Sequence, residues 1–237
     1  MMFFIIGRKS LIYFSLALFV IIFAGTIVKA VIPLQEKEIL VIIDPGHGEP
    51  DGGCVGVLGT VEQKINLSVA KKSAEIMEAK NIKTLLTRDS SLGLWSEKST
   101  TIRQKKLEDM NSRLEIIKKS RADLFISIHM NSYPTPDAKG LRIFYDKNHP
   151  EIKELAESIQ SRMSDVTGAK TSYVKPAERN LFLLKNTPMP AILIECGFLT
   201  NPQEEANLNT SEYQAKLAWA IADAVEKYYL NKEINRK

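Results

Sequence analysis

The sequence has little cysteine, and most of it carries almost no net charge. Cys54 and Cys196 are the only cysteines in 237 residues, too few for the disulfide framework that holds many small secreted domains together. Outside residues 1–30, which hold three basic side chains and no acidic one, 29 basic residues face 28 acidic ones. This balance gives no electrostatic reason to bind nucleic acid. We therefore expect free thiols and no nucleic-acid partner.

Internal repeats and low-complexity segments are also missing from the sequence. Apolar residues make up 44% of the chain and charged residues 25%, which is typical of a folded domain and argues against disorder. The length suits one α/β domain of ordinary size with an appendage.

The appendage is the N-terminal segment. Residues 11–28 include no charged side chain, and Arg8 and Lys9 precede them. The run is longer than the roughly 7–15 residues of a signal-peptide core and close to the roughly 20 that span a membrane. Because basic residues stay on the cytoplasmic side, the rest of the chain is expected outside the membrane. We predict an uncleaved membrane anchor within residues 1–30; the alternative is secretion after cleavage near Ala30.

The remainder predicts a linker over residues 31–38 and one domain over residues 39–232. Apolar runs predict strands at 39–43, 84–87, 124–128, 141–145, 181–184 and 191–194. Helical spacing of apolar residues predicts helices over 66–80, 101–119, 150–165 and 211–230. On the second of these helices the apolar stripe consists of Leu107, Met110, Leu114 and Ile117. The alternation predicts an α/β fold with a mostly parallel twisted sheet of about six strands and helices on both faces.

Three predicted strands end in residues that carry chemistry. A Pro-Gly turn after the first strand leads to His47, the strand at 124–128 ends in His129, and the last strand ends in Glu195. Ligands of open α/β sheets bind at the carboxyl ends of strands. Glu62 is close in sequence to the first histidine and precedes a predicted helix. We expect these side chains to form one site.

Two imidazoles and one carboxylate are a common catalytic zinc set that leaves a position for water. Zinc lowers the pKa of such a water to about 7, and a second carboxylate must then carry its proton to the leaving amine. Glu62 and Glu195 are candidates for these two roles, and the chemistry alone does not assign them. Asp44 is a rival ligand, but its place before a rigid turn suits it better to brace the loop or the His47 ring.

Four ordered sequence blocks resemble those of a known family. The blocks are residues 44–48 (DPGHG), Glu62 with Ile65-Asn66-Leu67, residues 127–131 (SIHMN) and residues 190–201 (PAILIECGFLTN). In this form and order they resemble the zinc-dependent N-acetylmuramoyl-L-alanine amidases, across residues 39–230. The loop at residues 48–53 and Met130 depart slightly from the family pattern, and neither departure touches a candidate ligand.

The resemblance implies a site and a reaction. It implies that His47, Glu62 and His129 bind Zn²⁺ and that Glu195 is the catalytic acid and base. The substrate would be peptidoglycan, cut at the amide between the lactyl group of muramic acid and L-alanine. The size, the predicted anchor and the lack of wall-binding repeats resemble the membrane-anchored form of spore-forming bacteria, which trims stem peptides of the spore cortex on the way to muramic lactam and belongs to sporulation and germination.

Two residues are further candidates for binding the anionic stem peptide. Arg88 follows the strand at 84–87, where it either faces the site or pairs with a nearby acid, and Asn131 lies just past His129.

Two other function classes stay open. A different zinc hydrolase of the cell wall, a peptidase or deacetylase, would use the same ligand set. A non-catalytic wall-binding scaffold would keep the fold, although the presence of Glu195 argues against it. An activating protein partner is not identified by the sequence.

Overall fold

The computed structural model describes residues 7, 13–19, 38–177 and 181–235. The chain divides into two units, residues 1–38 and residues 39–237. In the first unit, residues 13–19 are helical, and apart from Gly7 the rest of the predicted anchor lies outside the described residues. In the part of the chain that is described, no helix is long and apolar enough to cross a membrane.

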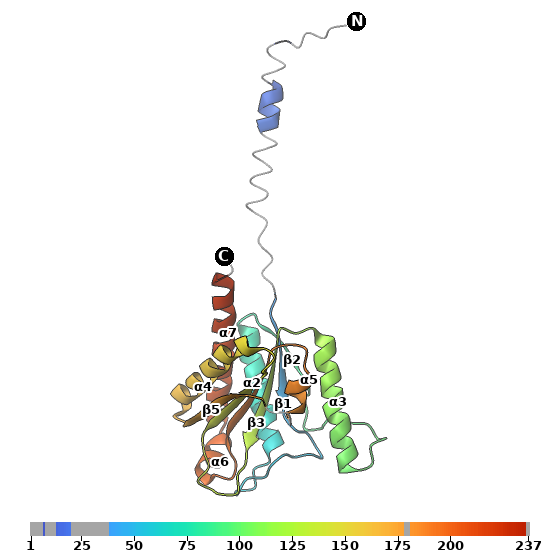
Figure 1. Ribbon diagram of the computed structural model, residues 1–237, viewed down its shortest axis with the longest axis vertical. Helices are drawn as coiled ribbons and strands as arrows, with labels where there is room; N and C mark the ends of the chain where they lie inside the picture. The colour runs from blue at the N-terminus through green and yellow to red at the C-terminus, as the bar shows by residue number, and fades with distance from the viewer. Residues whose placement is uncertain (1–6, 8–12, 20–37, 178–180, 236–237) are drawn as a thin grey trace. The chain divides into compact units, whose positions relative to one another are not determined.

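The second unit alternates strands and helices (Figure 1). Its strands are β1 (Leu40–Pro45), β2 (Lys83–Leu86), β3 (Leu124–Asn131), β4 (Leu141–Tyr145), β5 (Thr171–Pro176) and β6 (Ala191–Phe198). Its helices are α2 (Glu62–Ala79), α3 (Ile102–Ser120), α4 (Lys153–Thr167), α5 (Phe182–Asn186), α6 (Pro202–Leu208) and α7 (Ser211–Ile234), and a 3-10 turn, η1, precedes α4 at Pro150–Ile152.

The strands form one sheet in the order β2-β1-β3-β6-β4-β5. All neighbouring pairs are parallel except β4 and β6, which are antiparallel. The carboxyl ends of β1, β3 and β6 therefore meet at one edge, and the reversed β4 brings its amino end to that same edge. The predicted α/β fold with a mostly parallel sheet of six strands is confirmed.

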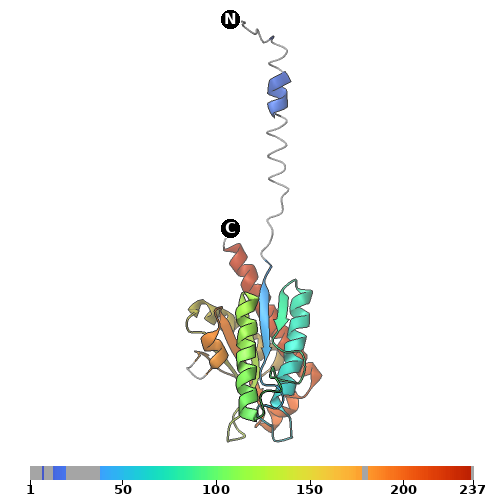
Figure 2. The same cartoon turned by 90° about the vertical axis from the view of Figure 1, so that its right-hand side faces the viewer.

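Helices cover both faces of this sheet. One face packs against α2, α4 and α7 through a large apolar cluster that includes Val41, Ile126 and Ile194. The other face packs against α3 and α5 through a smaller cluster that includes Ile42 and Phe125. Figure 2 shows α2 (cyan) and α3 (green) on opposite sides of β1 (blue). Consecutive strand residues point to opposite faces, which is why Val41 and Ile42 belong to different clusters.

Two local predictions were wrong. Residues 181–184, predicted as a strand, include the first three residues of the short helix α5, and β5 lies in the segment before them, where no strand was predicted. A run of four apolar residues does not distinguish a strand from one turn of helix. At the sheet edge, β5 is half-buried or exposed throughout, so its sequence lacks the apolar signal of the central strands.

Helix α3 also differs from its predicted apolar stripe. Leu107 is 62% exposed, whereas Arg113 is fully buried between α3 and β1. The Arg113 guanidinium contacts the Asp44 carboxylate at 2.7 Å and the Asp109 carboxylate at 2.9 Å. Asp44 also accepts hydrogen bonds from Thr87 and Ser127. The face of α3 that meets the sheet is therefore held by an ionic network as well as by Leu114 and Ile117.

This network fixes the loop that follows β1. Arg113 donates hydrogen bonds to the carbonyl oxygens of Pro45 and His47, in addition to its ion pair with Asp44. Burial raises the pKa of the Asp44 carboxyl, but the Arg113 charge and the hydroxyl hydrogen bonds outweigh it and hold that pKa below its usual value. The carboxylate is therefore charged at neutral pH, as its arginine partner requires.

Replacing Arg113 with alanine is predicted to lower the free energy of unfolding by about 3–5 kcal/mol, because it leaves the buried Asp44 charge without its partner. Arg103→Ala, on the exposed side of the same helix, should change it by less than about 0.5 kcal/mol. Urea unfolding of both variants measures the difference. A loss for Arg113→Ala as small as that of the control would contradict the prediction.

Candidate metal centre

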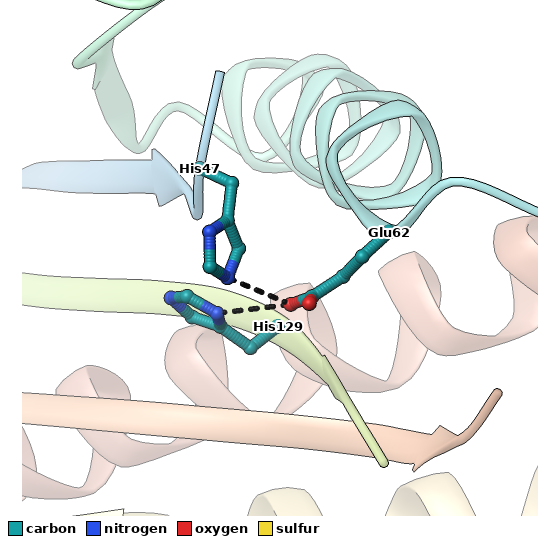
Figure 3. Close-up of side chains that lie close together, drawn as sticks. All are labelled: His47, Glu62 and His129. Atoms are coloured by element: carbon teal, nitrogen blue, oxygen red, sulfur yellow. Dashed lines mark hydrogen bonds and ion pairs between the residues drawn. The ribbon is translucent and has the colours of Figure 1, made fainter. Parts of the chain in front are cut away.

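His47, Glu62 and His129 come together at the carboxyl edge of the sheet (Figure 3). His47 lies in the loop after β1, His129 on β3 and Glu62 at the first position of α2. The Oε1 atom of Glu62 lies 3.3 Å from His47 Nε2 and 3.1 Å from His129 Nδ1. One ligand atom from each residue lies within 4.8 Å of the other two, a spacing that one metal ion can bridge.

Two glycines make room for this cluster. A Cβ atom at Gly46 would lie 2.2 Å from the His129 ring, and one at Gly53 would lie 2.4 Å from Glu62 Oε2. Gly53 also has a φ of 73°, which other residues rarely adopt. Any side chain at either position would displace a candidate ligand. The glycine-rich sequence around His47 is thus explained by close packing against the cluster.

Asp51 orients the His47 ring. Its Oδ2 atom lies 3.0 Å from His47 Nδ1 and 2.8 Å from Lys106 Nζ. This contact leaves Nε2 of the same ring to face Glu62, which is the usual arrangement of a carboxylate behind a metal-binding histidine. Burial alone would lower the pKa of His47, but the Asp51 and Glu62 carboxylates raise it to about 9. The sequence offered Asp44 for this bracing role, and Asp51 was overlooked.

The Glu62 carboxylate is held from several sides. Its oxygens accept hydrogen bonds from the backbone N–H groups of Cys54 and Met130 and from the side chain of Asn66. Burial raises the pKa of Glu62, but the two histidines outweigh it and keep that pKa well below its usual value. The carboxylate is therefore charged and fixed, as a metal ligand must be.

Asp44 and Arg88 support the loop and do not join the cluster. The Asp44 carboxylate is taken up by Arg113, Thr87 and Ser127, which suits the bracing role predicted for it. Arg88 is buried, and its guanidinium donates to backbone carbonyl oxygens, including those of Gly46 and His47. Because its N–H groups are already hydrogen-bonded to these carbonyl oxygens, we propose that Arg88 holds the loop after β1. The substrate contact considered from the sequence would need N–H groups that are free.

Glu195 lies beside the cluster without joining it. It is on β6, directly opposite His129 in the parallel register with β3. Its Oε2 atom is buried and, among the described residues, has no hydrogen-bond partner. Burial, together with the nearby Glu62 charge, raises the pKa of Glu195 to about 8, although Arg142 and His47 oppose the shift. A carboxyl group with this pKa exchanges a proton readily near neutral pH.

The two cysteines and Asn131 complete the surroundings. Cys54 and Cys196 are free thiols, as expected, and burial raises the pKa of Cys54 to about 12. Asn131 ends β3 on the same side as His129, and its side-chain oxygen accepts a hydrogen bond from the Ser132 backbone. Its expected contact with the substrate stays a prediction. Arg142 of β4, which the sequence analysis passed over, lies opposite Glu195.

The donor set fits a divalent metal. Two imidazole nitrogens and one carboxylate oxygen converge, the carboxylate is charged, and the buried Oε2 of Glu195 next to them has no partner among the residues described. Two histidines and one carboxylate are the ligands of many catalytic zinc sites, whereas calcium takes about six to eight oxygen ligands.

Comparison with known proteins identifies the family. The family model described as N-acetylmuramoyl-L-alanine amidase matches residues 41–227, which include the whole cluster. The chain belongs to this amidase family. Its members are hydrolases of an amide bond in peptidoglycan, so the predicted family and enzyme class are confirmed. The match favours an amidase over the peptidase, deacetylase and scaffold alternatives.

Individual relatives agree with the family. The amidase is 33% identical over 201 residues to the germination-specific N-acetylmuramoyl-L-alanine amidase of Bacillus subtilis, covering 85% of this chain and 83% of that one. The structure of the CwlD amidase of Clostridioides difficile, in complex with the GerS lipoprotein, superposes with a TM-score of 0.77 at 37% identity, covering 81% and 98%. The amidase AmiC2 of Nostoc punctiforme gives a TM-score of 0.70 at 31% identity, covering 81% and 97%.

Replacing His47 or His129 with alanine is predicted to remove bound zinc, because each substitution deletes one of three protein ligands. His149→Ala is the matched control, since this histidine lies beyond β4 and contacts Asp146 and Glu151. Metal analysis of the purified variants after dialysis against zinc gives the stoichiometry. Undiminished zinc in both His47→Ala and His129→Ala would disprove the ligand assignment.

The pH dependence of zinc affinity is a second readout of the role of His47. With its pKa at about 9, His47 of the metal-free protein is protonated at neutral pH and must release that proton when a metal binds. Zinc affinity should therefore rise with pH up to about pH 9, by up to about tenfold per unit for one released proton. An affinity independent of pH between about pH 6 and about pH 8 would contradict the role of His47.

Proposed function

We propose that this amidase is zinc-dependent and hydrolyses the amide between the lactyl group of muramic acid and L-alanine in peptidoglycan stem peptides. The observation that carries the proposal is the cluster of His47, Glu62 and His129 beside a buried Glu195, within a chain that matches the amidase family. His47 Nε2, His129 Nδ1 and Glu62 Oε1 would hold the metal. A zinc ion so held is a Lewis acid that polarises a carbonyl group and lowers the pKa of water to about 7.

Glu195 is proposed to carry the proton in this reaction. Amide cleavage needs a base that accepts a proton from the attacking water and an acid that gives one to the departing nitrogen. The raised pKa of Glu195, about 8, lets one carboxyl group do both near neutral pH. Glu62 is not available for this task, because its oxygens are engaged by two histidines and by backbone N–H groups.

The substrate is proposed to approach along the α3 and α5 side of the sheet. A cavity of about 190 Å³ opens there, lined by His47, His129, Lys106 and Phe182 among others. Lys106 lines this cavity and pairs there with the Asp51 carboxylate at 2.8 Å. Asn131 remains a candidate substrate contact at the end of β3.

The biological setting is proposed from the relatives. A related protein is named germination-specific, and this supports a role in trimming the spore cortex. Cell-wall substrates lie outside the cytoplasmic membrane, so the enzyme is proposed to act there, held by an anchor within residues 1–30. A related amidase is bound to a lipoprotein, and this supports a protein partner for this chain, whose identity is open.

Glu195→Gln is predicted to lower amide cleavage by about 10²–10⁴-fold and to keep the zinc, because glutamine retains the shape of the side chain but cannot carry a proton. Glu62→Gln should lose zinc affinity together with activity. Mass spectrometry of peptidoglycan fragments, after incubation with zinc and residues 31–237, measures release of peptides that begin with L-alanine.

Zinc stoichiometry of the same variants separates the two roles. The exposed Glu212→Gln is the control and should match the unmodified enzyme in both assays. If Glu195→Gln loses its metal and Glu62→Gln retains it, the assigned roles are exchanged. Fragments cut within the peptide, or glycan that has lost only acetyl groups, would establish a peptidase or a deacetylase instead.

The N-terminal segment is predicted to keep the enzyme on the outer surface of the membrane. Cells expressing the full chain should yield the protein in the membrane fraction, and external protease should digest it in protoplasts. Deleting residues 1–30 should move it to the soluble fraction. Full-length protein in the cytosol would refute the anchor, and an extracellular product starting near Val31 would show cleavage.

A further inference from the structure

Arg142 occupies a position next to the catalytic chemistry that no part of the proposed reaction uses. It is the second residue of β4, and in the antiparallel pairing with β6 it lies directly opposite Glu195. Side chains of directly opposed residues stand on the same face of a sheet. Arg142 therefore projects from the face that carries Glu195 and His129, and the reversed direction of β4 places it at the active-site edge.

The guanidinium group of Arg142 is held in place by aromatic rings. Its central carbon lies 4.5 Å from the ring centre of Phe198 and 5.2 Å from that of Tyr173. Tyr173 itself packs edge-on against Phe144, with the ring centres 5.7 Å apart. Such stacking orients the plane of an arginine and leaves its N–H groups free for a planar acceptor.

Within the described part of the chain, those N–H groups have no acceptor. Among the residues that the structure describes, no side chain or carbonyl group accepts a hydrogen bond from the Arg142 guanidinium, and no carboxylate pairs with it. Its Nε atom is buried and still has no partner. By contrast, Arg113 and Arg88 are saturated with acceptors. Arg142 as a whole is half-buried, but a buried N–H group without an acceptor is costly, so an acceptor from outside the chain would be bound favourably.

A second positive charge, that of Lys175, lies on the neighbouring edge strand. The Nζ atom of Lys175, on β5, lies 4.2 Å from the ring centre of Tyr173. The one acidic side chain that opposes Arg142 in the sheet register is Glu195. Two cations and the Tyr173 ring thus lie on the face where the helices α2, α4 and α7 do not pack, with Arg142 opposite the catalytic carboxyl group and Lys175 further along the sheet.

We propose that Arg142, supported by Lys175, forms a subsite that binds a carboxylate of the stem peptide on the peptide side of the scissile amide. This inference rests on the proposed function and adds a substrate preference to it. The enzyme would favour stem peptides with free carboxylates over peptides whose carboxylates are amidated. A guanidinium matches a carboxylate with two parallel hydrogen bonds, which a neutral carboxamide cannot accept in the same way.

The test uses two synthetic N-acetylmuramoyl-L-alanyl peptides that differ only in having free carboxylates or carboxamides. Arg142→Gln should raise KM for the acidic substrate by about 10- to 100-fold, with kcat nearly unchanged. KM for the amidated substrate should stay the same. Arg103→Gln, which removes an exposed charge from α3, should affect neither substrate, and Arg142→Lys should recover part of the loss.

Several outcomes would overturn the subsite. Equal losses on both substrates, or a fall in kcat, would show that Arg142 acts on Glu195 or on the fold. The same KM for both substrates in the unmodified enzyme would do so as well. Should Arg142→Gln fail to fold, the comparison of Arg142→Lys with the unmodified enzyme decides.

Binding of the product peptides keeps this inference separate from the proposed function. Calorimetric titration of the unmodified enzyme with the released L-alanyl peptide, in its acidic and amidated forms, requires no turnover. Tighter binding of the acidic form, lost in Arg142→Gln, supports the subsite even if the enzyme cleaves neither substrate. Equal binding of both forms by an enzyme that cleaves both refutes the subsite and leaves the amidase function intact.

Discussion

The ion pair between Asp44 and Arg113 is the interaction on which the site depends. It connects the end of β1 to α3 at the base of the loop that carries His47, and the same guanidinium holds the carbonyl oxygens of Pro45 and His47. Because both charges are buried, neither is tolerated without the other. The backbone that presents His47, the first candidate metal ligand, is therefore fixed by contacts in the interior of the protein.

A second constraint is the space between the ligands. Glu62 receives both imidazoles on one oxygen atom, so the three groups already converge in the protein alone. Gly46 and Gly53 permit this convergence, since even a methyl group at either place would collide with a ligand. Asp51 then orients the His47 ring, and Asn66 with backbone N–H groups holds Glu62, which is how a binding site for a small cation avoids reorganisation.

The sequence predicted the elements that carry strong local signals. The buried strands β1, β3 and β6 have apolar runs, and the residues that follow these runs identified His47, His129 and Glu195 as one group. The edge strand β5 and the short helix α5 were missed, because one is polar and the other is as short as a strand. Arg142 was passed over, and a structural role on its helix could be expected for Arg113 but its partners could not be named. The surroundings of an arginine in a helix or a strand are known only once the fold shows which groups it contacts.

The antiparallel direction of β4 has a consequence for how this enzyme can diversify. Arg142 is anchored within the sheet by hydrogen-bonded strands on both sides, so its backbone has little freedom to lose when a ligand binds. A recognition group on such a frame can be exchanged for another side chain without altering the loops that hold the metal ligands. Substrate choice and metal binding are thereby placed on separate parts of the chain, and selection can change one while preserving the other.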